Sequence, residues 1–297
     1  MVVIGVCVLL VLAGLAAVVR WGGLTVEPPR APERAGSGDP ADPGDPPADP
    51  AGPPPVGLVA RRYLWAVNLA VVAGVGAGVM AAGAGGRLVM RLLAVTAGEG
   101  AQGRITEADQ VVGRISVGGT VGFVIFTALF FGTASGAAYL LLRRWLPAGR
   151  AGGLVYGALL LLLAGTRLEP LREGNVDFDL VGPGWVSVLA FSALVVFHGM
   201  LVTALAGRAS RAVPLLAREP RAVAAHAPLL LLVPLLPVVG VLAVVGALVV
   251  LTTRARPVLA AWHAHRLVPV GQVLLAVVVL LALPGFASSV ASILDRS

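Results

Sequence analysis

Three side chains capable of charge or acid–base chemistry stand within the apolar stretches of this chain. Arg87 and Arg91 follow a long apolar run and are four residues apart, so on a helix they share one face. His198 falls near the middle of another apolar run, which begins at Trp185. Ionisable groups at membrane depth indicate a solute or ion pathway, so these three are candidate solute- or anion-binding residues. The alternative, favoured for each residue taken alone, is that the arginines reach headgroups and the histidine hydrogen-bonds a neighbouring helix.

A second set of candidates follows in a polar loop, with oxygen-bearing side chains at alternate positions: Asn175, Asp177 and Asp179. In an extended segment they share a face, and their spacing resembles the first half of a calcium-binding loop. The sixth and twelfth positions of such a loop require glycine and glutamate, but here they are Leu180 and Val186. We keep the three as weak cation-binding candidates. Solvation, or pairing with Arg167 and Arg172, is the favoured alternative, with Phe178 directed toward the bundle.

Two further patterns carry weaker chemical signals. Ser135-Gly136 together with His198-Gly199 resembles the Ser/His dyad of rhomboid proteases, but Thr133 stands at the first glycine of their Gly-x-Ser-Gly motif. Ser135 also falls inside an apolar run, so packing of small residues explains it better. His263 and His265 diverge on a helix and have no third metal ligand nearby in sequence. With no HExxH, CxxC or phosphate-loop motif, we expect no cofactor, no metal and no enzymatic activity.

The elements that must position these residues are membrane spans. Of the 297 residues, 58% are hydrophobic and 12% are charged, with a mean hydropathy of +0.91. Soluble proteins are about 25% charged, so this apolar surplus must face lipid. The net charge of +7 comes from arginines at the ends of apolar runs, where they meet headgroups, and it does not indicate nucleic acid. The absence of lysine excludes a retinal Schiff base and a lysine-bearing phosphate loop.

Apolar runs predict an all-α, polytopic transmembrane bundle of about seven spans. The expected spans are Val2–Val19, a helix from about residue 65 to Gly86, Gly118–Leu142, Gly152–Leu168, Trp185–Ala206, about Pro228–Thr253, and Leu267 to about Ala287. Residues 1–21 are expected to form an anchor helix, 22–60 a disordered linker rich in proline and aspartate, and 61–297 a six-span bundle. No basic residue precedes the first run, so we expect an uncleaved anchor in the cell membrane with its N-terminus outside and the linker cytoplasmic. A cleaved signal peptide is the alternative.

Small residues recur every four positions along the second span, which places them on one face of the helix. We expect Gly74, Gly78 and Gly86 to be helix-packing positions, because small residues let neighbouring backbones approach closely in lipid. The glycines at 83–86 are expected to loosen the end of this helix. Gly118/Gly122 and Gly132/Gly136 repeat the same spacing in the third span. Thr106 with an acid three residues later predicts a short surface helix at about 106–115.

Residues 61 to about 221 resemble multi-pass integral membrane proteins of GC-rich bacteria, through the stretches RLVMRLLAVT…QGRITEADQVVGRI, LLRRWLP and NVDFDLVGPGW. The resemblance implies a class and no activity. Our first hypothesis is a non-enzymatic membrane protein that binds or transports a small solute or ion. The alternative is a structural or regulatory membrane subunit that acts through helix contacts of the glycine stripe. Expected partners are the lipid bilayer and either another membrane protein or a second copy of the chain.

Overall fold

The computed structural model describes residues 1–29, 56–107, 111–168, 170–180, 182–235 and 267–295. Within these ranges every named element is a helix, and the single β pairing is an isolated bridge between Ile105 and Val111. The all-α prediction is confirmed. The α-helices are α1 (Val2–Trp21), α2 (Val56–Ala77), α3 (Gly86–Thr96), α4 (Val117–Thr127), α5 (Thr133–Leu142), α6 (Gly149–Leu160), α7 (Gly184–Ala212), α8 (Pro220–Ala225) and α11 (Val268–Asp295). Three π-helices, η1 (Gly78–Gly85), η3 (Ala128–Gly132) and η4 (Leu161–Gly165), and three 3₁₀ helices, η2 (Glu99–Ala101), η5 (Val176–Asp179) and η6 (Ala227–Leu235), complete the described part.

Five described helices are long and apolar enough to cross a membrane: Val2–Trp21, Val56–Thr96, Val117–Leu142, Gly184–Ala212 and Val268–Asp295. A sixth expected span corresponds to a shorter apolar helix, Gly149–Gly165. The span expected at about Pro228–Thr253 lies largely outside the described residues, as do His263, His265 and linker residues 30–55. Its described beginning is the 3₁₀ helix η6, which contains Pro234. Proline removes a backbone donor and so disfavours a regular α-helix there.

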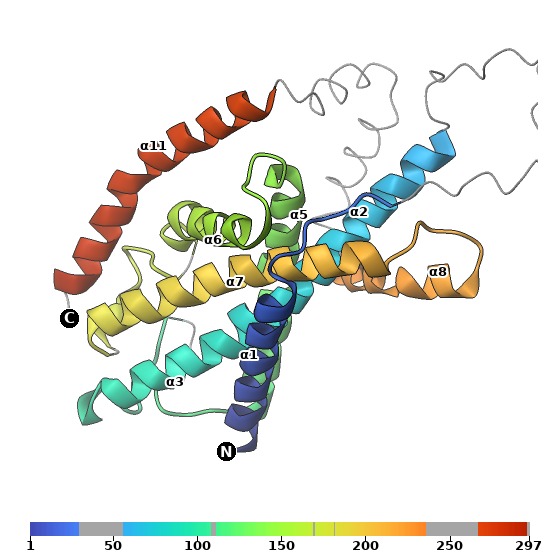
Figure 1. The fold of residues 1–297 in the computed structure, drawn as a ribbon. Helices are drawn as coiled ribbons and strands as arrows, with labels where there is room; N and C mark the ends of the chain where they lie inside the picture. The colour runs from blue at the N-terminus through green and yellow to red at the C-terminus, as the bar shows by residue number, and fades with distance from the viewer. Residues whose placement is uncertain (30–55, 108–110, 169, 181, 236–266, 296–297) are drawn as a thin grey trace, which may run out of the picture.

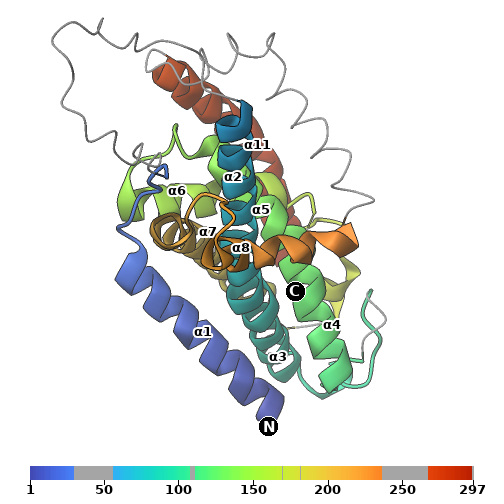
Figure 2. The same cartoon turned by 90° about the vertical axis from the view of Figure 1, so that its right-hand side faces the viewer.

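The centre of the bundle is one long helix formed by α2, η1 and α3 (Figures 1 and 2). This helix is 41 residues long. In its most apolar stretch 56% is buried, whereas the corresponding share is 39% or less in each of the other four helices able to cross a membrane. It contacts α1, α4, α5 and α7. The expected end of this helix at about Gly86 is wrong, because the helix continues to Thr96; the segment with Gly83 and Gly85 is the wider π-helix η1, and it does not end the helix. Gly83 packs against Val124 and Gly85 against Leu194, so tertiary contacts override the low helix propensity of glycine.

The small residues of α2 and of the start of η1 face a second row of small residues on η3 and α5. A Cβ added to Gly74 would lie 2.7 Å from the carbonyl carbon of Gly132 and would overlap its oxygen. A Cβ on Gly78 would lie 2.5 Å from the Cα of Ala128. The two helices are therefore in backbone contact, the arrangement that small residues permit between helices in lipid.

The other glycines of this pattern differ in their surroundings. Gly136 belongs to the same contact, since a Cβ there would lie 3.0 Å from the carbonyl carbon of Ala70. Gly86 faces the ring of Phe123, and a Cβ added to this glycine would lie 3.2 Å from the nearest ring carbon. Gly118 and Gly122 have no neighbouring atom within 4 Å of such a Cβ. Identical spacing thus gives one tight helix contact and one open surface.

The loop between α3 and α4 contradicts the predicted surface helix at about 106–115. Its described residues form turns and the bridge between Ile105 and Val111. The amide of Val112 donates to the carbonyl of Arg104 at 2.9 Å, so backbone bonds cross the loop and do not follow a helix. Gly103 and Gly113, with φ of 81° and 86°, provide the left-handed turns that this path requires.

Candidate functional site

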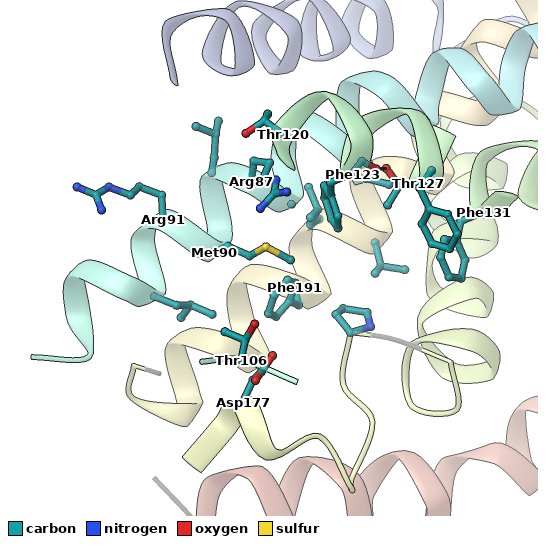
Figure 3. A pocket seen from close by; sticks show the side chains of 18 of the residues that line it. Arg87, Met90, Arg91, Thr106, Thr120, Phe123, Thr127, Phe131, Asp177 and Phe191 are labelled. Atoms are coloured by element: carbon teal, nitrogen blue, oxygen red, sulfur yellow. Dashed lines mark hydrogen bonds between the residues drawn. The ribbon is translucent and has the colours of Figure 1, made fainter. Parts of the chain in front are cut away.

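A cavity of about 790 Å³ lies between α1, α3, α4, η4 and α7. Its wall includes both sequence-predicted arginines, Arg87 and Arg91, and also His198. Asn175 and Asp177 line it too, whereas Asp179 does not. The long central helix supplies the arginines, and α7 supplies the histidine, more than 100 residues later in the chain. Figure 3 shows the arginines and several aromatic side chains around this space.

Arg87 is half-buried at the wall of the cavity. Its Nη2 atom donates to the carbonyl of Gly119, and its guanidinium lies over the Phe123 ring, 4.5 Å from the centroid. Its Nε atom is buried without a hydrogen-bonding partner, and no acidic side chain pairs with it in the described part of the chain. Buried polar atoms are nearly always hydrogen-bonded, so an unpaired guanidinium N–H needs an explanation.

Thr120 is a second residue of the cavity wall that has a buried, unpaired polar atom. It follows Gly119, the residue whose carbonyl Arg87 binds, and it is 6% exposed. Its Oγ1 atom is buried without a partner among the described residues. Arg87 and Thr120 both line the cavity and are labelled in Figure 3. Each of the two residues has one N–H or O–H group without an acceptor among the described residues.

The rim of the cavity is basic. Arg91 lies one turn beyond Arg87 and donates to the carbonyl of Gly113 at 3.4 Å, while Arg114 lines the rim from the following loop. The two acids of the wall have partners in the protein: Glu107 forms an ion pair with Arg172 at 2.6 Å, and the Oδ1 atom of Asp177 accepts from the amide of Glu107 at 2.8 Å. The positive charges therefore dominate the cavity.

The proposed cation-binding segment folds differently from its sequence-based expectation. It is the 3₁₀ helix η5 and not an extended strand, and the side chain of Asn175 caps it by accepting from the amide of Asp177 at 2.8 Å. Its oxygens are therefore not aligned on one face. The described residues contain no group of three or more His, Cys, Asp or Glu suited to a metal ion. Phe178 is buried, as expected, in a cluster with Leu171 and Phe191.

His198 is buried and contacts Ser135 on the facing helix α5. The Nε2 atom of His198 lies 2.8 Å from the Oγ atom of Ser135, and the Ser135 hydroxyl also reaches the carbonyl of Gly132 at 2.8 Å. The hydroxyl of Tyr156 donates to the carbonyl of Ser135. If the serine donates to Gly132, then His198 donates through Nε2, and the trio links α5, α6 and α7 by hydrogen bonds.

The second ring nitrogen of His198 lies near the central helix. Among the described residues, Nδ1 forms no hydrogen bond of normal geometry. The backbone of Ala77 nevertheless lies close enough to interact with the ring. Close packing holds the ring there, because a Cβ on Gly157 of α6 would lie 2.7 Å from the Cα of Val196 on α7. The sequence named His198 and Ser135 but carried no signal for Tyr156, Thr120 or Phe123 as members of this region.

Comparison of the chain with protein-family models, with curated proteins and with solved structures gives no match. The class of the molecule therefore follows from its architecture. The described residues form a helical bundle with five helices able to cross a membrane, around a mainly apolar cavity with a basic rim.

Proposed function

We propose that this chain is an integral membrane protein that binds an anionic ligand in the cavity, without catalysing a reaction. The observation that carries the proposal is the half-buried guanidinium of Arg87 in the cavity wall, whose Nε atom has no partner and which no acidic side chain neutralises among the described residues. A desolvated guanidinium without an anion is costly, and a charge-assisted hydrogen bond to a bound anion offsets that cost. Arg91 and Arg114 at the rim raise the local concentration of anions.

The alternative function, a structural or regulatory subunit that works through the glycine stripe, needs that stripe to face outward. Gly74 and Gly78 instead contact Gly132 and Ala128 of the same chain. This surface is occupied within the molecule, which favours the ligand-binding proposal over the subunit proposal.

Cys7 provides a direct test, because it is the only cysteine in the chain and its side chain lines the cavity. In protein reconstituted into phosphatidylcholine nanodiscs, a bound anion should slow the reaction of Cys7 with N-ethylmaleimide. At ten times the Kd, occupancy leaves about a tenth of the protein free, so the rate should fall about tenfold. The probes are oleate and inorganic phosphate, and mass spectrometry measures the labelled fraction. Arg87→Gln should reduce the slowing, expressed as the ratio of rates with and without the anion, to about twofold or less, because a tenfold weaker Kd leaves at least half of the protein free at the same concentration.

The matched control moves the thiol to the outside of α1. Val8 is exposed and does not line the cavity, so the double variant Cys7→Ser, Val8→Cys should react at the same rate with and without the anion. Equal slowing of this variant would reveal a bulk effect of the probe on the bilayer. The proposal fails if neither anion protects Cys7, or if protection is unchanged in Arg87→Gln.

A second function, acyl transfer, is favoured by one observation, the contact between Ser135 and His198. A serine nucleophile requires a base at this distance. In the described residues, however, no acidic group orients the Nδ1 atom of His198, and the serine hydroxyl also bonds to Gly132. We expect a fluorophosphonate probe to leave Ser135 unlabelled. Labelling of the wild-type protein that is lost in both Ser135→Ala and His198→Gln would establish the catalytic function.

The orientation in the membrane is a separate part of the proposal. The run Val2–Val19 is followed directly by Arg20, and a positive flank favours the cytoplasmic side of a span, which favours a cytoplasmic linker. A green fluorescent protein inserted within the Asp-Pro repeats should therefore fluoresce, since it folds in the cytoplasm. Activity of alkaline phosphatase inserted at the same place would instead place the linker outside.

A further inference from the structure

We infer that the ligand of this cavity is a single-chain anionic amphiphile, of the fatty-acid class, that enters sideways from the bilayer. The inference rests on the proposed anion-binding function of Arg87. It adds the chemistry of the rest of the ligand, which the walls of the cavity define.

The walls are mostly apolar and aromatic. Five phenylalanines line the cavity, together with aliphatic side chains from α1, α3 and η4: Phe123, Phe126, Phe131, Phe178 and Phe191. A small hydrated anion such as phosphate would leave this surface without a partner. An acyl chain would bury it, and burial of apolar surface is the main favourable contribution to such binding.

The size of the cavity suits one chain. Its volume of about 790 Å³ falls within the range of roughly 300–1,000 Å³ that holds compact small-molecule ligands. A two-chain phospholipid has about twice the apolar volume of a fatty acid and a bulkier headgroup. A single-chain ligand with a compact acidic group therefore matches both the volume and the polar end at Arg87 and Thr120.

The wall is open on the side of α4 and η3. Phe126 and Phe131 line the cavity and are also 51% and 38% exposed, and Met90 on α3 is 41% exposed. Phe126 stacks near Phe130 and Phe131, with ring centroids 4.8 and 6.0 Å apart. Exposed apolar side chains on a membrane-spanning helix face acyl chains, so lipid and cavity are continuous here.

The charges around the cavity select an anionic headgroup. Arg87, Arg91 and Arg114 face it with positive charge, whereas the carboxylates of Glu107 and Asp177 are held by protein groups. Among the described residues, the remaining titratable side chains of the wall are Cys7 and His198, and both are buried. A cationic or zwitterionic headgroup would place positive charge beside the three arginines.

The experiment compares four probes in the Cys7 protection assay: oleate, oleyl alcohol, inorganic phosphate and phosphatidylglycerol. We expect oleate to protect Cys7 at the lowest concentration, since it alone combines one chain with a compact anion. Arg87→Gln should weaken oleate protection about tenfold or more, because hydrogen bonds to charged groups contribute about 1.5–3 kcal/mol. Thr120→Val removes a hydroxyl at nearly constant volume and should weaken it severalfold. Thr120→Val also tests the inference if Arg87→Gln folds poorly.

The remaining outcomes separate the inference from the proposed function. If phosphate or phosphatidylglycerol protects as well as oleate, and does so in an Arg87-dependent manner, the single-chain inference is overturned and anion binding stands. If oleyl alcohol protects as well as oleate in both wild type and Arg87→Gln, the cavity binds acyl chains without selecting for charge. That result would contradict both the single-chain inference and the proposed anion-binding function. Protection by none of the four probes also overturns both.

Discussion

Replacing Gly74 with alanine is expected to lower the free energy of unfolding by about 3 kcal/mol, the upper end of the usual cost of overpacking. The added methyl carbon would lie 2.7 Å from the carbonyl carbon of Gly132, and its oxygen is closer still. The neighbour is backbone, so no side chain can rotate to make room. Relief requires α5 to move away from α2. Thermal unfolding in a mild non-ionic detergent, followed by far-UV circular dichroism, measures the loss.

Gly122 on α4 offers the matched control for this substitution. It lies in the same GxxxG spacing, but no atom stands within 4 Å of an added Cβ. Gly122→Ala should therefore be neutral or stabilising by up to about 1 kcal/mol, the difference in helix propensity between the two residues. If both variants lose the same stability, the α2–α5 contact is looser than the structure describes.

Replacing His198 with leucine should lower the free energy of unfolding by about 1–3 kcal/mol, because it leaves Ser135 with one hydrogen-bonding partner fewer in a buried site. In a membrane we expect a loss near the lower limit of this range, because side-chain hydrogen bonds between spanning helices contribute about 0.6 kcal/mol on average. Glutamine places an amide where Nε2 stands, so His198→Gln should remain close to wild type.

A double-mutant cycle separates this hydrogen bond from simple packing. If the contact couples α5 to α7, the effect of His198→Leu should shrink in a Ser135→Ala background. Additive effects of the two substitutions would contradict a direct interaction. Val202→Ala, a buried truncation on the same helix without a polar group, provides the packing reference.

The period of the small residues was enough to predict which face of α2 is packed, but not what packs against it. Gly132/Gly136 and Gly118/Gly122 are indistinguishable in sequence, and only the first pair meets a neighbouring backbone. The spacing of a motif fixes a face of a helix, whereas contact depends on helices far away in the chain. The same reason explains why Arg87 and His198 could be named singly, while their place around one cavity could not be predicted.

Predictions made from local sequence patterns were wrong where the backbone forms other hydrogen bonds. Thr106 and the acid after it suggested a helix start, but Gly103 and Gly113 turn the chain so that Val112 bonds to Arg104 across the loop. Asn175 and its neighbours suggested an extended segment, but the Asn175 side chain caps a 3₁₀ turn. In both cases a side-chain or glycine effect a few residues away decided the conformation.

The π-helix η1 separates two roles within the longest helix. Before it, Gly74 points at α5, and after it, Arg87 points into the cavity. A wider turn at this position changes the angular phase between the two halves, which a continuous α-helix would fix at about 100° per residue. Each π-turn closes an i→i+5 hydrogen bond and so holds one residue more than an α-turn, and deleting one residue from η1 should let it relax to an α-helix while Arg87 keeps close to its present direction. The half of the helix that packs against α5 and the half that lines the cavity are thus joined by a π-helical segment, and the direction in which Arg87 faces depends on the wider turns of η1 as well as on the position of the arginine in the sequence.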